Sequence, residues 1–178
     1  PAARSHDPAV LSARARVCTP TRRNLCASTR ARREPEPTVT SVYRAPMRSR
    51  RDDLDPQPAI NRALTHGLCG FGDDPSPQAS ERFARRVDRF AAAPDGSLVW
   101  TRDGDGLYWL GRLAGPYFYD AGGESVDLVH VRRCVWREHP VLESQAPAAV
   151  VATFGRGGRN FQQIHDDHVG AASEQLWH

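Results

Sequence analysis

The chain has 178 residues, enough for one ordinary domain with a tail, and 39% of them are apolar. All 24 basic residues are Arg, as in the GC-rich genomes of the actinobacterial type, and no apolar run approaches the ~18 residues of a membrane-spanning helix. We therefore expect a cytoplasmic protein without a membrane segment, whose four cysteines, lacking a C-x-x-C pair, stay reduced.

Charge divides the chain into two parts. Residues 1–51 carry 12 Arg against three acidic residues, a net of +9, whereas the remaining 127 residues carry 12 Arg against 18 acidic residues, a net of −6. Residues 1–58 also lack a regular apolar period, so they cannot bury enough surface to offset the entropy of ordering them. We predict a disordered Arg/Pro-rich tail. The alternatives are a solvated segment, an arm that holds phosphate backbones, or a reading frame extended upstream of a natural start at or near Met47.

From Ala59 the pattern becomes that of a folded domain. Apolar residues at helical spacing predict a helix from Ala59 to about Leu68, where glycines follow. A second, amphipathic helix is expected over about residues 77–92, with Ser76 as its N-cap and proline at its first position.

A β region follows the second helix. Residues 97–101 and 107–113 predict two strands joined by a turn of the Asp-Gly kind. Strand alternation places Trp109 and Leu113 on one face of the second strand and Arg112 on the other. The later elements are a bent loop at 114–125, a long strand at 126–136, a short apolar helix or strand at 146–154, a glycine-rich turn at 155–159 and a last strand at 160–164.

These elements predict an α+β domain at residues 59–165, built around a small β-barrel of four or five strands with two or three helices. Residues 166–178 are expected to form a C-terminal tail or a short helix.

Several uncommon residues occur in a fixed order along this domain: Gly111, Gly115, Pro116, Tyr117, Tyr119, His130, Val131, Arg132, Trp136, Pro147, Phe154, Gly155 and Ile164. This order resembles the module that precedes the nuclease in Mrr-like restriction endonucleases. The resemblance spans about residues 60–165 and implies a PUA/EVE-like (SH3-like) barrel that recognises nucleic acid, DNA rather than RNA, in a restriction- or defence-related setting. Ala148 stands where the module often has Arg. The chain has no Lys for the nuclease chemistry of those enzymes.

The predicted site is an aromatic face with neighbouring cations. Aromatic rings there would stack a base, which is worth ~1–3 kcal/mol per base, and Arg and His would bind its edge or a phosphate. A backbone concavity in the loop at 155–159 would hold an anion. The alternatives are that the aromatic residues only fill the barrel and that the loop is a plain glycine turn. The predicted nucleic-acid-binding residues are Trp109, Arg112, Tyr117, Tyr119, His130, Arg132, Arg156 and Arg159.

The sequence offers no arrangement of catalytic residues. His165 and His168 suggest a metal site, but a solvated C-terminal segment explains them better, because no third ligand cluster is evident. We therefore expect a non-catalytic nucleic-acid-binding module without a cofactor or metal. The alternatives are a protein-interaction or regulatory subunit that binds a partner through the barrel face, and a small-molecule sensor.

Overall fold

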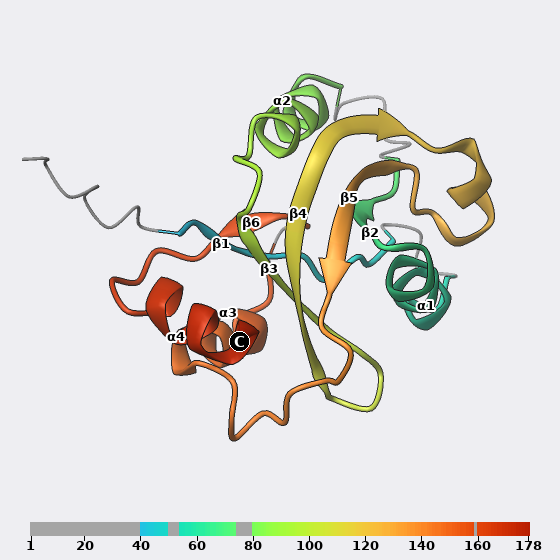
Figure 1. Cartoon of the computed structure of the whole chain (residues 1–178). Coiled ribbons are helices and arrows are strands. Elements are labelled where there is room, and N and C mark those ends of the chain that lie inside the picture. The colour runs from blue at the N-terminus through green and yellow to red at the C-terminus, as the bar shows by residue number, and fades with distance from the viewer. Residues whose placement is uncertain (1–39, 50–53, 74–79, 159) are drawn as a thin grey trace, which may run out of the picture. The chain divides into compact units, whose positions relative to one another are not determined.

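The computed structural model describes residues 40–49, 54–73, 80–158 and 160–178, all of which belong to a compact unit of residues 37–178. Six strands form one sheet in the order β2-β5-β4-β3-β1-β6 (Figure 1). Only β1 and β3 run parallel; the other neighbours are antiparallel. The strands are β1 (Val42–Arg44), β2 (Leu68–Phe71), β3 (Leu98–Arg102), β4 (Tyr108–Tyr119), β5 (His130–Trp136) and β6 (Gln162–Gln163).

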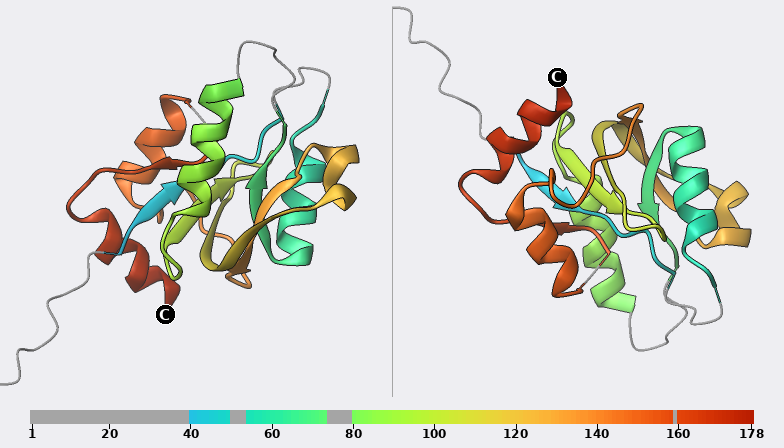
Figure 2. Two further views of the ribbon diagram at one scale, coloured as in Figure 1. Left: turned by 90° about the horizontal axis from the view of Figure 1, so that it is seen from above. Right: turned by 90° about the horizontal axis from the view of Figure 1, so that it is seen from below.

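Helices cover the sheet at both ends. Figure 2 shows α3 (Ala148–Gly155) and α4 (Val169–Trp177) beside the β1–β3 end, and α1 (Gln57–His66) with the 3-10 helix η1 (Ala121–Val126) beside the β2–β5 end. The remaining α-helix, α2 (Ser80–Ala91), packs its buried Phe90 against a cluster of residues from β2, β3, β4 and β5. The predicted α+β class is confirmed. The described strands do not close into a barrel, because β2 and β6 are edge strands of an open sheet.

The predicted N-terminal boundary of the domain is wrong for residues 40–49. β1 lies inside the sheet between β3 and β6, and Val42, Ala45 and Met47 are all buried. The strand has only three residues, too few to show a period of two among the arginines and prolines around it. Residues 1–39 and 50–53 of the predicted tail lie outside the described residues.

Two other boundaries differ from the sequence prediction. Leu68 begins β2 instead of continuing α1, because Gly67 adopts a left-handed conformation (φ 62°) that ends the helix. β4 continues as far as Tyr119, through a register shift between Ala114 and Tyr117, where we expected a bent loop. The predicted start of α2 at Ser76 lies outside the described residues.

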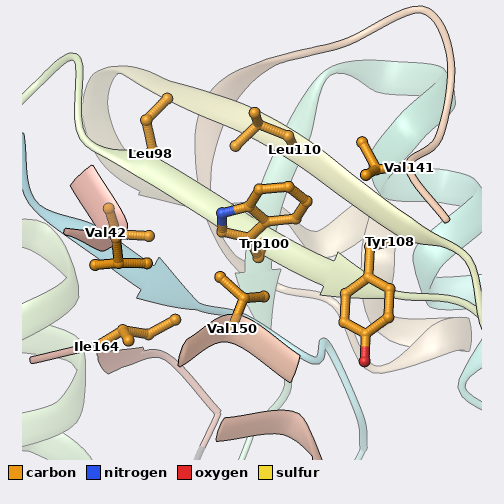
Figure 3. Packing of buried hydrophobic residues seen from close by; sticks show 9 residues of the cluster. Val42, Leu98, Trp100, Tyr108, Leu110, Val141, Val150 and Ile164 are labelled. Carbon is orange, nitrogen blue, oxygen red and sulfur yellow. The ribbon is translucent and has the colours of Figure 1, made fainter. Parts of the chain in front are cut away.

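A cluster around Trp100 joins the sheet to α3 and α4 (Figure 3). The Trp100 indole is fully buried, and its Nε1 donates a hydrogen bond of 3.1 Å to the Ser173 hydroxyl of α4. The backbone N–H groups of His168 and Val169 donate to the Asp166 carboxylate at the start of this helix. The C-terminal segment is therefore a helix that belongs to the core.

Candidate nucleic-acid interface

The structure places Arg112 on the opposite face of β4 from the predicted aromatic residues. Side chains alternate along a strand, so Arg112 points away from Trp109 and Leu113. Beyond the bulge, Tyr117 pairs with Arg132 as Leu113 pairs with Cys134, so Tyr117 also lies on the face opposite Arg112. Its guanidinium donates to Glu174 at 2.6 Å and lies 4.7 Å from the ring centroid of Trp177, both on α4. The single predicted face is therefore not formed.

Trp109 shares a face with Tyr117 but lies near the other end of β4. Eight positions separate the two residues, and two of these positions lie in the bulge of β4, so at ~3.3 Å per residue the side chains are roughly 20 Å apart. The Trp109 indole donates to the Asp103 carboxylate in the β3–β4 hairpin at 2.9 Å. Trp109 and Tyr117 are therefore too far apart to contact the same base.

Arg132 has a structural role. Its side chain is 2% exposed, and its Nε donates to the Gly115 carbonyl at 2.9 Å. One terminal nitrogen donates to the carbonyls of Phe90 and Ala93, and the other pairs with Asp95. The guanidinium thus joins the end of α2 to the bulge of β4, and it is not exposed to a ligand.

Tyr117, Tyr119 and His130 are the predicted residues that the fold brings together. The Tyr117 hydroxyl lies 2.9 Å from Nδ1 of His130, and Nε2 of the same imidazole lies 2.7 Å from the Asp73 carboxylate. A carboxylate only accepts hydrogen bonds, so Nε2 carries a proton, and in the neutral imidazole Nδ1 accepts from Tyr117. Burial, followed by the negative charge of Asp73, raises the pKa of Tyr117, which keeps the phenol protonated.

This arrangement leaves Tyr119 as the ligand-accessible member of the group. His130 is 7% exposed and uses both ring nitrogens within the protein, so it has none left for a base. Tyr119 is 50% exposed and packs edge-on against the imidazole at a centroid distance of 5.5 Å. The hydrogen-bonded group therefore supports one exposed aromatic ring.

The glycine-rich loop after α3 is placed in part. Arg156 is exposed, and its guanidinium donates to the Thr153 hydroxyl at 3.4 Å. Arg159 lies outside the described residues. Gly157 of the same loop, however, lines a hollow that the sequence did not predict.

The hollow, which we call the arginine hollow, has a volume of about 240 Å³ and lies where β1, the β3–β4 hairpin and the end of α3 meet. Three of its residues are arginines from separate segments: Arg44 from β1, Arg48 from the segment after it, and Arg102 from the end of β3. The complete lining is Arg44, Pro46, Arg48, Arg102, Asp103, Gly104, Gly106, Phe154 and Gly157.

Contacts within the protein hold these cations near one another. The Arg44 guanidinium lies 4.8 Å from the ring centroid of Phe154, and that of Arg102 donates to the Gly106 carbonyl at 3.4 Å. Burial lowers the pKa of Arg44, and the positive charge of Arg48 lowers it further. Cations that repel one another in a partly buried hollow favour the binding of an anion.

The one carboxylate in the lining, that of Asp103, already accepts hydrogen bonds within the protein. Oδ1 of Asp103 accepts from the backbone N–H of Leu107 at 2.8 Å, and Oδ2 accepts from the Trp109 indole at 2.9 Å. Arg102 also pairs with Glu143 outside the lining at 3.4 Å, but both side chains are about half exposed, and such pairs contribute little. The lining residues therefore carry three positive charges against one negative charge.

Sequence reasoning missed the hollow because Arg44 and Arg48 fall in the segment predicted to be disordered. The positive charge of that segment did suggest an arm that holds phosphate backbones. It gave no indication that the arginines lie against β3 and α3. The parallel register of β1 and β3, with Arg44 opposite Trp100, brings Arg44 next to residues almost 60 positions later.

Comparisons with known proteins add no assignment. No family model matches the chain, and no curated protein matches it. Among solved structures, the chain is similar to the protein Atu2648 from Agrobacterium tumefaciens, with 10% identity and a TM-score of 0.35 over 76% of this chain and 92% of that one. A likeness at this level carries no argument about function.

Two further observations hold for the residues that the structure describes. Among them, no three His, Cys, Asp or Glu side chains gather closely enough to hold a metal ion. None of the helices in these ranges is both long and apolar enough to cross a membrane.

Proposed function

We propose that the chain is a non-catalytic nucleic-acid-binding module that holds a phosphate group in the arginine hollow. The observation that carries this proposal is the convergence of Arg44, Arg48 and Arg102 on one concave surface. Guanidinium groups form forked, charge-assisted hydrogen bonds with phosphate oxygens, and phosphate contacts supply most of the affinity of proteins for nucleic acids.

Tyr119 supplies the second contact in this proposal. Its half-exposed ring can stack on a base of a single strand, which is worth about 1–3 kcal/mol. The PUA/EVE-like relationship, the preference for DNA and the restriction-related setting belong to the same proposal, and the order of motifs from Gly111 to Ile164 supports them. We also propose a cytoplasmic location, which the spacing of the four cysteines supports.

The proposal is tested by measuring the affinity of the full chain for a fluorescent single-stranded oligonucleotide at two salt concentrations. Arg102→Gln should weaken binding by about tenfold and reduce the slope of log K against log salt by roughly 0.7–0.9. Arg82→Gln removes the same charge from an exposed position of α2, outside the hollow, and serves as the matched control. The parent chain and both variants keep the same N-terminal arginines, so the contribution of these arginines to the affinity cancels in the comparison. Equal affinities of Arg102→Gln and Arg82→Gln would refute the proposal.

A further inference from the structure

The arginine hollow has features that distinguish between kinds of phosphate. An internal phosphodiester carries one negative charge, whereas a terminal phosphomonoester carries about −1.5 to −2 at pH 7 and presents three oxygens. The lining has three guanidinium groups and one carboxylate whose oxygens accept hydrogen bonds within the hairpin. Arg48 and Arg102 come from separate segments, and their forked donors can reach the three free oxygens of a terminal phosphate, whereas an internal phosphodiester offers two.

The size of the hollow also favours a terminal group. Pockets for whole small molecules have volumes of about 300–1,000 Å³, and this one has about 240 Å³. The ring of Phe154 is already in contact with the Arg44 guanidinium and packs edge-on against Tyr108 at 5.5 Å. Phe154 therefore forms a wall of the hollow and is not a platform for a base.

Glycines in the hairpin leave room for the cations. Gly106 has a φ of 86°, and a Cβ atom at this position would lie 3.3 Å from Nη2 of Arg102. The absent side chain lets the Arg102 guanidinium lie against the hairpin backbone, where its Nε donates to the Gly106 carbonyl. Arg102 is thus positioned along the wall of the hollow, with less rotamer freedom to lose when an anion binds.

We propose that the arginine hollow binds the terminal phosphomonoester of a nucleic-acid strand in preference to internal phosphodiesters. This inference rests on the proposed function and assigns the hollow a substrate class, strand ends that carry a phosphate. Tyr119 lies at the end of β4 farthest from the hollow. When the hollow holds the terminal phosphate of a nucleic acid, this ring is left to contact bases further along that nucleic acid.

The test uses the full chain and three single-stranded DNA oligonucleotides of one sequence, with a 5′-phosphate, with a 3′-phosphate, and with hydroxyl groups at both ends. Fluorescence anisotropy gives the three affinities at pH 7.5. We expect at least one phosphorylated oligonucleotide to bind about tenfold more tightly than the unphosphorylated one. Because the second pKa of a phosphomonoester is about 6, this ratio should fall towards one at pH 5.5.

Two variants test whether the preference for the phosphorylated oligonucleotide arises in the arginine hollow. Arg48→Gln changes an exposed side chain, so it should fold, and Arg102→Gln changes a second position from another segment. Both should abolish the preference for the phosphorylated strand, and Arg82→Gln should keep it. A preference that survives both hollow variants would overturn the inference.

The remaining outcomes separate the two proposals. If all three oligonucleotides bind equally and Arg102→Gln still weakens binding, the hollow holds internal phosphates; the inference then fails and the proposed function stands. If Arg102→Gln changes nothing, or no oligonucleotide binds at low salt, both fail.

Discussion

Removing β1 should destabilise the domain strongly, although the segment resembles a disordered tail in the sequence. The variant starts at Met47 and is compared with one that starts at Pro37, the first residue of the compact unit. The shorter chain loses the strand that lies between β3 and the edge strand β6, and Val42 leaves the Trp100 cluster. We expect the Met47 variant to be largely unfolded or to unfold at much lower urea concentration.

The size of the effect follows from the contacts that are lost. Three backbone hydrogen bonds of 2.8–2.9 Å disappear, from Leu98 to Ser41, from Ala45 to Trp100 and from Ile164 to Val42. At about 0.5–1.5 kcal/mol each they contribute about 1.5–4.5 kcal/mol. The burial of Val42, which is 1% exposed, adds about 1.5–3 kcal/mol. Domains of this size are stable by about 5–15 kcal/mol, so the deletion removes a large fraction of the total.

Urea denaturation, followed by tryptophan fluorescence and circular dichroism, measures the difference in unfolding free energy between the two variants. A difference below about 1 kcal/mol, with unchanged spectra, would contradict the placement of β1 in the sheet.

Three further predictions concern the core. Arg132→Met should lower the free energy of unfolding by about 3–5 kcal/mol, because three carbonyl groups lose the buried guanidinium that donates to them; urea titration measures the loss, and a variant as stable as the parent would contradict the structural role. Burial raises the pKa of Cys69 to about 12, from 9.0, so the unfolded thiol ionises first as the pH rises. Stability should therefore fall between pH 9 and 12, by about 1.4 kcal/mol per pH unit, and Cys69→Ala should lack this component when both proteins are titrated from pH 8 to 10.5. Gly70→Ala should cost about 1–3 kcal/mol, because the new Cβ would lie 2.2 Å from the His130 carbonyl oxygen, whereas Gly155→Ala, with open space around it, should be nearly neutral in the same thermal unfolding assay.

The sequence predicted elements whose signals are local. The β3–β4 hairpin followed from its Asp-Gly turn, where Asp103 and Leu107 exchange backbone and side-chain hydrogen bonds. The long strand predicted over residues 126–136 contains β5, which begins at His130. β1 could not be predicted, because three residues hold no period and the strand depends on pairing with β3 and β6, far away in sequence.

The candidate site was predicted only in part, because residue type does not determine which face a residue occupies. Arg132 and Arg112 have the composition of a phosphate site, yet the first is buried under α2 and the second pairs with α4. The residues that do line a positive hollow, Arg44 and Arg48, carried no structural signal of their own. A parallel strand pair was needed to place them beside Arg102.

Asp127 connects the two features of the proposed interface. It adopts a left-handed conformation (φ 54°) after η1, and its carboxylate accepts from the Ser49 hydroxyl and from the backbone N–H of Asp73. Ser49 follows Arg48 of the hollow, and Asp73 holds the imidazole of His130 beneath Tyr119. The segment that contributes a cation to the hollow is therefore anchored to the group that supports the exposed ring. Because one buried carboxylate accepts from both segments, we expect substitution of Asp127 to disturb both proposed contacts, the phosphate in the hollow and the base on Tyr119.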